Sequence, residues 1–233
     1  MKRLALVLCV TFVCLSAARA ESQSNTSDTL YSLGTRVFDF GHPSSILDMQ
    51  EELDFVSLTN VPWIRDMTWS DPLLAATVIH IKDNTSLYAL GEPGWLPDLR
   101  SLFHSDPTLP SIFDLEGYEV GWFGQAREAR SRGDILIFPR NDPQSFHVLC
   151  AYDRSEPQPT FCSVNFRYWA DPNLRIRIRI YQVTSPLNDF AEIVARVDAL
   201  VRCLDVTEVV QPVRRASQIR RCRTSPSLLR RSN

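Results

Sequence analysis

The chain has 233 residues, of which 44% are apolar and 22% charged, so it can bury a core and its composition is not that of a disordered protein. Its net charge of −2 is unevenly spread: residues 214–233 hold seven arginines and no acid, whereas residues 21–213 hold 15 basic and 27 acidic side chains. A body this acidic repels nucleic acid and anionic lipid, so we expect no nucleic-acid partner.

The first twenty residues have the layout of a secretory signal peptide. Lys2 and Arg3 precede an apolar run over residues 4–17, and Ala18 and Ala20 are small residues at the positions that signal peptidase reads. The run is shorter than the ~20 residues that cross a bilayer. We therefore predict export to the periplasm or the extracellular space, cleavage after residue 20 and no transmembrane anchor.

The next part of the chain predicts short elements of mixed type. A polar leader, residues 21–30, carries an Asn-Thr-Ser glycan acceptor pattern at Asn25, and a second one begins at Asn84. The elements that we predict are a strand over 35–40, a helix over 46–55 and a hairpin of 76–81 with 86–90. Residues 91–110 hold four prolines and two glycines and are a candidate boundary between two lobes of one domain, residues 21–213.

The second half of the chain has clearer periodicity. We predict four strands, over residues 134–138, 146–152, 161–169 and 174–183. Ser185 is a suitable cap for a following helix, and apolar residues recur at helical spacing from Phe190 to Leu204. This pattern predicts an α+β fold in which an antiparallel meander packs against a C-terminal amphipathic helix, after a less regular N-terminal half.

Four cysteines follow the predicted signal peptide. An even number in an exported protein favours disulfides. Folding residues 146–169 into a hairpin places Cys150 almost opposite Cys162, so we predict a bridge between them. The same spacing suits two zinc ligands, but no second pair or nearby histidine completes a tetrahedral site. Cys203 and Cys222 form a second candidate pair.

The strand over residues 174–183 alternates arginine with aliphatic residues. Arg175, Arg177 and Arg179 should therefore line one face of the sheet. One interpretation is that they pair with acids on neighbouring strands. The other is that they bind an acidic partner or an anionic ligand, with Trp169 and Tyr181 as aromatic anchors of the same interface.

The sequence contains no recognisable catalytic, cofactor or metal-binding motif. There is no Gly-x-Ser-x-Gly elbow, no phosphate-binding glycine loop and no dense histidine–carboxylate cluster. We therefore predict no catalytic residue, metal or cofactor. The alternative is an exported hydrolase in which His42 or His147 meets an acid such as Asp39.

The order of predicted elements near the C-terminus resembles that of small exported proteobacterial proteins. These elements are an alternating strand from Phe161 to Tyr168, a second alternating strand and a helix containing Arg196-Val-Asp-Ala-Leu200. The resemblance concerns residues 161–204, and several proteins of that group are immunity-like partners of secreted toxins. It implies a binding or inhibitory protein with a protein partner, an immunity protein for an envelope-targeted toxin being one form. A structural envelope protein is a further alternative.

The arginine-rich C-terminal segment, residues 214–233, has no apolar periodicity. It holds Pro226 and a run of like charges that repel one another. We predict a disordered basic tail, which only a disulfide between Cys203 and Cys222 would tether to the body of the protein.

Overall fold

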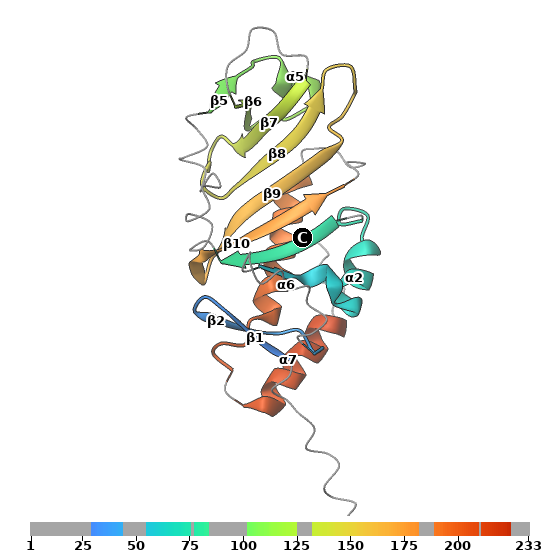
Figure 1. Ribbon diagram of the computed structural model, residues 1–233, viewed down its shortest axis with the longest axis vertical. Helices are drawn as coiled ribbons and strands as arrows, with labels where there is room; N and C mark the ends of the chain where they lie inside the picture. Colours follow the sequence, from blue (N-terminus) through green and yellow to red (C-terminus); the bar gives the residue numbers. More distant parts are fainter. Residues whose placement is uncertain are drawn as a thin grey trace, which may run out of the picture.

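The computed structural model describes residues 29–43, 55–75, 77–83, 102–124, 132–181, 189–209 and 211–224. These residues form two antiparallel sheets and several helices, labelled along the chain in Figure 1. The smaller sheet pairs β1 (Leu30–Leu33) with β2 (Arg36–Asp39). The predicted signal peptide, the strand over 86–90 and the helix cap at Ser185 lie outside the described residues.

The larger sheet has eight strands in the order β3-β4-β10-β9-β8-β7-β6-β5, and every neighbouring pair is antiparallel. From β5 to β10 consecutive strands are neighbours, and β4 and β3 then extend the sheet beyond β10. The predicted α+β class with an antiparallel meander is confirmed. The eight strands are β3 (Phe55–Ser57), β4 (Thr77–Asp83), β5 (Phe103–Ser105), β6 (Tyr118–Phe123), β7 (Arg132–Pro139), β8 (Phe146–Asp153), β9 (Phe161–Tyr168) and β10 (Asp171–Ile180).

The two halves of the chain share this sheet, because β4 lies between β3 and β10. Of the helix predicted over residues 46–55, only Phe55 is described, and it begins β3 rather than ending a helix. The helical segments between the strands are η2 (Leu58–Asn60), α2 (Pro62–Trp69) and α5 (Leu109–Ile112). The sheet thus includes strands from both sides of the boundary predicted within 91–110.

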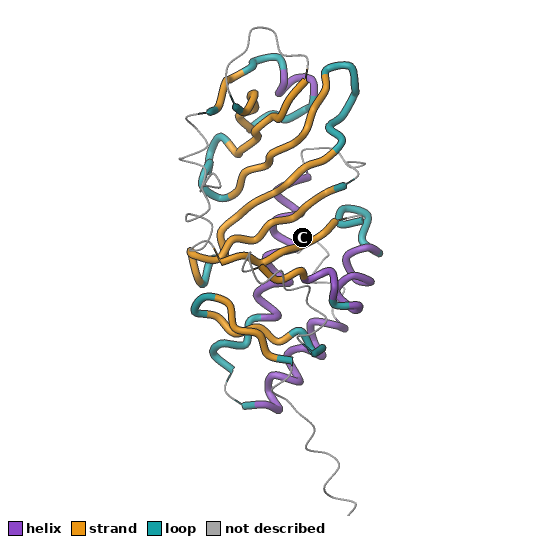
Figure 2. The backbone as a smooth tube through the Cα atoms, in the orientation of Figure 1, coloured by secondary structure: helices purple, strands orange, loops and turns teal. Residues whose placement is uncertain are grey.

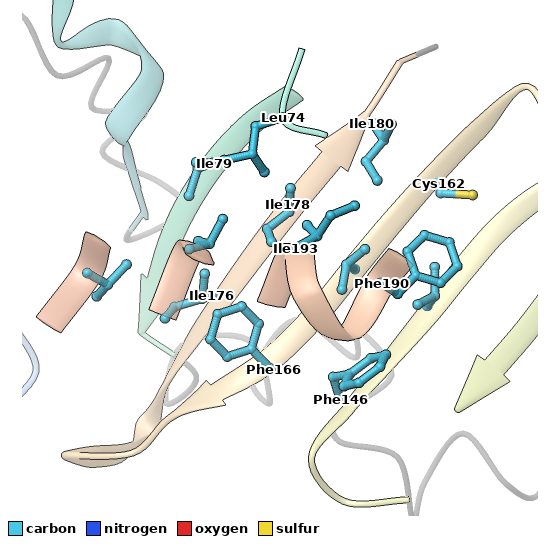
Figure 3. Close-up of a cluster of buried hydrophobic side chains, with 14 of the residues drawn as sticks. Leu74, Ile79, Phe146, Cys162, Phe166, Ile176, Ile178, Ile180, Phe190 and Ile193 are labelled. Carbon is cyan, nitrogen blue, oxygen red and sulfur yellow. The ribbon is translucent and has the colours of Figure 1, made fainter. Parts of the chain in front are cut away.

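The helix α6 (Phe190–Leu204) covers one face of the larger sheet. It passes behind the strands in Figure 1, and Figure 3 shows Phe190 and Ile193 among side chains of β9 and β10. Burying such a side chain stabilises the fold by roughly 1.5–3 kcal/mol. The predicted apolar stripe is confirmed by the buried residues of the helix, which are Phe190, Ile193, Val197, Leu200, Val201 and Leu204.

The alternation in β10 gives the sheet two chemically different faces. Successive side chains of a strand point to opposite faces. Leu174, Ile176, Ile178 and Ile180 are buried in the hydrophobic core on the α6 side. Arg175, Arg177 and Arg179 therefore lie on the opposite face, which we call the arginine face.

A disulfide joins β8 to β9. Cys150 and Cys162 are directly opposite each other in the register, and their Cα atoms are 4.1 Å apart. This confirms the predicted pairing. Both cysteines are fully buried, so the bridge lies within the core and fixes the alignment of the two strands.

The C-terminal segment differs from the prediction of a disordered tail. Residues 212–224 form the helix α7 (Pro212–Thr224), and a disulfide joins Cys222 to Cys203 of α6. Gln218 Nε2 donates hydrogen bonds to the carbonyl oxygens of Cys203 (2.8 Å) and Asp205 (3.0 Å). The prediction was wrong because this helix buries only two residues, Ile219 and Cys222, and so has no periodic apolar stripe in its sequence. The disulfide and the hydrogen bonds hold the helix in place instead of broad apolar packing. Residues 225–233 lie outside the described part.

The small sheet and α7 lie at the same end of the elongated molecule (Figure 2). Arg223 of α7 donates a hydrogen bond to the carbonyl oxygen of Gly41 (2.7 Å), which follows β2. Asp205, directly after α6, accepts hydrogen bonds from Arg36 Nε (2.8 Å) and the Tyr168 hydroxyl (2.7 Å). The segment that follows α6 is therefore bound to both sheets through Asp205, and α7 is bound to the residue after β2. Among the described helices, none has the length and apolar character needed to cross a bilayer.

Candidate functional site

A hollow of about 230 Å³ opens on the arginine face. The described residues that line it come from four strands, β6, β8, β9 and β10. Its polar lining consists of Arg175, Arg177, Arg179, His147, Asn165 and Ser163, and its apolar lining consists of Phe123, Leu149 and Phe161. All three arginines predicted as binding residues thus line one hollow.

Antiparallel pairing sets these side chains in rows across the sheet. Arg177 is opposite Asn165 of β9, which is itself opposite His147 of β8. Arg179 is opposite Ser163, which is opposite Leu149. The rows place the guanidinium groups along one side of the hollow, on β10, and His147 and Leu149 two strands away, on β8.

Hydrogen bonds hold the middle of the site in place. Arg177 Nε donates a hydrogen bond to Asn165 Oδ1 (3.1 Å), and Asn165 Nδ2 donates one to the carbonyl oxygen of Ser163 (3.1 Å). Asn165 is 4% exposed, so this hydrogen bond orients Arg177 from within the sheet. A guanidinium fixed in this way loses less side-chain entropy when it binds a ligand.

The residues opposite the arginines on β4 and β9 are not acids. Lys82 and Arg167 flank Arg175, and His80 and Asn165 flank Arg177. The neighbours of Arg179 are Val78 and Ser163. None of these six directly opposite positions has a carboxylate. Adjacent strands instead concentrate cationic side chains on this face.

Two buried histidines on this face have lowered pKa values, because they are removed from water and lie close to the positive charges. Burial, together with Arg175 and Arg177, lowers the pKa of His147 to about 3. Burial also lowers the pKa of His80 to about 4, and Arg179, Arg177 and Lys82 add to the shift. Both imidazoles are therefore neutral near pH 7, and the arginines and Lys82 supply the positive charge. A neutral His147 can still donate one hydrogen bond to a ligand.

The two predicted aromatic anchors lie in different places. Tyr181 follows β10, and its ring centroid is 5.5 Å from that of Phe161, which lines the hollow. Trp169 lies at the turn between β9 and β10, where the guanidinium of Arg202, from α6, is 4.6 Å from its ring centroid. The structure therefore places Tyr181 beside the hollow and Trp169 on the helix side of the molecule.

The sequence reasoning did not include the lining residues from β6, β8 and β9 in the site. A signal was present for two of these strands, because the predicted Cys150–Cys162 bridge fixes the pairing of their neighbours. From that pair, the register places Leu149 opposite Ser163 and His147 opposite Asn165. The position of Phe123 depends on the pairing of β6 with β7, and β6 was not among the strands predicted from the sequence.

Of the groups proposed for a hydrolase, His147 and Asp39 line different hollows. Asp39 lines a separate hollow of about 350 Å³ between α7 and the end of β2, and Asp39 Oδ1 accepts a hydrogen bond from the Gly41 amide (2.8 Å). His147 lines the arginine hollow instead. Within the described ranges, no group of three or more histidine, cysteine or acidic side chains is placed to bind a metal ion.

Comparison with known proteins gives no assignment. No protein-family model, no curated protein and no solved structure matches the chain.

Proposed function

We propose that this protein is exported and acts by binding, with the arginine hollow receiving an acidic group of a protein partner. The observation that carries the proposal is the gathering of Arg175, Arg177 and Arg179 around one hollow. A guanidinium presents a planar set of donors that matches a carboxylate, and such charged hydrogen bonds are about twice as strong as neutral ones.

The burial of the site strengthens this interaction. Arg175 is 3% exposed, and its neighbour Lys82 is 4% exposed. Charges interact more strongly where water is excluded: at about 4 Å, the attraction of two unit charges rises from ~1 kcal/mol in water to ~4 kcal/mol near a protein surface. The electrostatic attraction between the arginines and an anion is therefore stronger inside the hollow than on an open surface.

The acidic composition of the rest of the chain acts in the opposite direction at long range. Residues 21–213 hold 27 acidic side chains against 15 basic ones. At physiological ionic strength such long-range repulsion is screened beyond about 8 Å, whereas contacts inside a buried hollow are screened far less. The arginines of the hollow therefore determine the charge of the ligand that binds there. The surrounding acids repel nonspecific polyanions.

Export is supported by the two disulfides, which form and persist in oxidising compartments. The predicted signal peptide makes the periplasm or the extracellular space the destination that we propose. The resemblance of residues 161–204 to immunity-like exported proteins favours an inhibitory role, in which the partner is a toxin delivered to the cell envelope. In that role the hollow would bind an acidic side chain or chain end of the toxin.

A titration with labelled peptides of defined charge tests this proposal. We expect a hexaglutamate peptide to bind the purified, disulfide-bonded protein, and a hexalysine peptide of the same length not to bind the hollow. Arg177→Gln should weaken binding of the acidic peptide by roughly tenfold or more, because a charged hydrogen bond contributes about 1.5–3 kcal/mol.

Arg202→Gln is the matched control, because Arg202 is an arginine of α6 whose partner is Asp198 (2.7 Å) and which lies away from the hollow. It should leave the affinity unchanged. Equal affinity of the wild type and Arg177→Gln for the acidic peptide, or a preference for the basic peptide, would exclude the arginine hollow as the binding site.

A further inference from the structure

The lining of the hollow is cationic on β10, whereas on β8 and β6 it is apolar except for His147. Arg175, Arg177 and Arg179 stand on β10, whereas Leu149 stands on β8 and Phe123 on β6. Phe161, at the other end of β9 from Arg167, adds an apolar ring between these strands. A site for a simple inorganic anion would need only the first of these two surfaces.

The apolar side is accessible to a ligand. Phe123, Leu149 and Phe161 are only partly buried, unlike the fully buried Leu136 and Val148 next to them in the sheet. Partly exposed apolar groups beside a hollow gain free energy when a ligand removes them from water. The apolar lining therefore favours a ligand that carries an apolar group as well as a charge.

The dimensions of the hollow limit that ligand to one ring-sized or branched group. A cavity of about 150 Å³ accommodates benzene, and drug-sized ligands occupy about 300–1,000 Å³. The hollow has about 230 Å³. Neighbouring strands are about 5 Å apart, so β8 lies ~10 Å from β10 across the sheet. A short acid that ends in a ring is long enough to reach from the arginines to the apolar side.

We infer that the arginine hollow binds an amphipathic carboxylate: an acid group, received by Arg177 and Arg179, attached to a single aromatic or branched apolar group received by Leu149 and Phe161. Two sources supply this chemistry, a free aromatic acid and the C-terminal residue of a protein chain. The inference rests on the proposed function and specifies the ligand of the same site.

Arg179 is suited to the first contact with the carboxylate. In the described part of the structure, no hydrogen bond or ion pair joins it to another side chain, whereas Arg177 is oriented by Asn165. Ser163, directly opposite Arg179 in the register, offers an additional hydroxyl donor. Together they can satisfy more than one lone pair of a carboxylate.

Calorimetric titration with small probes tests the inference. We expect 3-phenylpropionate to bind the disulfide-bonded protein about tenfold or more tightly than acetate, because one ring is removed from water. The neutral analogue 3-phenylpropanol should bind far more weakly than the acid. The two sources are distinguished with acetylated Ala-Ala-Phe, prepared with a free and with an amidated C-terminus. If the free-acid peptide binds at least as tightly as 3-phenylpropionate, the site is assigned to a chain end. If only 3-phenylpropionate binds, the site is assigned to a free acid.

Two variants separate the components of recognition. Leu149→Ser should remove most of the preference for 3-phenylpropionate over acetate and keep acetate binding, whereas Arg177→Gln should weaken both acids. Equal affinity for acetate and 3-phenylpropionate would overturn the amphipathic ligand and leave the proposed anion site intact. Failure of every anion and acidic peptide to bind would overturn the proposed function itself.

Discussion

The two faces of the larger sheet are made by the same strands and yet have opposite chemistry. On one face, β10 contributes leucine and isoleucine side chains to the core beneath α6. On the other, its arginines gather around a hollow with His147 and Asn165. Because each strand supplies alternate residues to the two faces, one set of backbone hydrogen bonds supports both. In β10, therefore, the aliphatic side chains contribute to the core and the arginines contribute to the hollow.

This division has a physical consequence for mutation. Residues beneath α6 are stabilised by close packing and removal from water, which tolerate little change. Residues of the arginine face lie in a hollow, so changes of charge there alter the field more than the packing. The following predictions test whether the two faces are separable in this way, from the largest expected effect to the smallest.

The largest effect is expected from a cavity on the α6 face. Ile178 is fully buried, so Ile178→Ala should reduce the free energy of unfolding by about 4 kcal/mol, within the usual range of ~2–5 kcal/mol. Urea denaturation measures the change. Its neighbour Arg179→Ala, on the other face, is the matched control and should cost less than about 1 kcal/mol. Similar losses for the two variants would contradict the division between the faces.

The second effect concerns the disulfide that fixes β8 against β9. A Cys150→Ala/Cys162→Ala double variant should lose about 3 kcal/mol of stability in the loop-entropy model, because the bridge closes a loop with a sequence separation of 12. The register also aligns the lining of the hollow, so the affinity for acidic probes should fall together with stability. An unchanged affinity in the folded double variant would show that strand pairing alone aligns the site.

The third predicted effect is a loss of stability as the pH falls, and it arises from two histidines on the arginine face. His80 and His147 have pKa values of about 4 and about 3 in the folded protein, below the unfolded value of 6.5. As pH falls below 6.5, the unfolded chain binds protons first, so stability is complete above pH 6.5 and is lost toward the folded pKa values. From pH 7.5 to 5.5, each histidine should cost about 1.4 kcal/mol.

Thermal and urea denaturation of His147→Gln against pH measure this contribution. The variant should lose about half of the pH-dependent destabilisation. A wild-type protein whose stability is constant between pH 7.5 and 5.5 would contradict the neutral state of the two buried histidines.

The smallest loss of stability is expected for Arg177→Gln, the variant for which we expect a large loss of affinity. Arg177→Gln should change the free energy of unfolding by no more than about 1 kcal/mol, since the side chain is partly exposed and glutamine keeps a donor for Asn165. The same variant should lose roughly tenfold in affinity for acidic probes. A loss of several kcal/mol would instead make the arginine a structural element of the sheet.

Much of this division could be predicted from local patterns. The alternation over residues 174–180 predicts that aliphatic and arginine side chains lie on opposite faces, and the helical spacing of apolar residues up to Leu204 predicts the helix that covers the first face. The loop between Cys150 and Cys162 predicts their bridge. Each of these features depends on a period or a spacing within a short segment, and such signals are present before the chain folds.

Tertiary structure decided the rest. The placement of β4 beside β10, and thus of Lys82 and His80 beside the arginines, depends on which strands pair across long stretches of chain. The helix α7 has too few apolar residues for a periodic signal, and its disulfide to α6 and its hydrogen bonds hold it in place. Trp169 is separated from the hollow because a turn directs it toward α6. The sequence by itself determined which side chains share a face of a strand, because the backbone alternates, whereas the site required the packing of the whole sheet to bring those faces together.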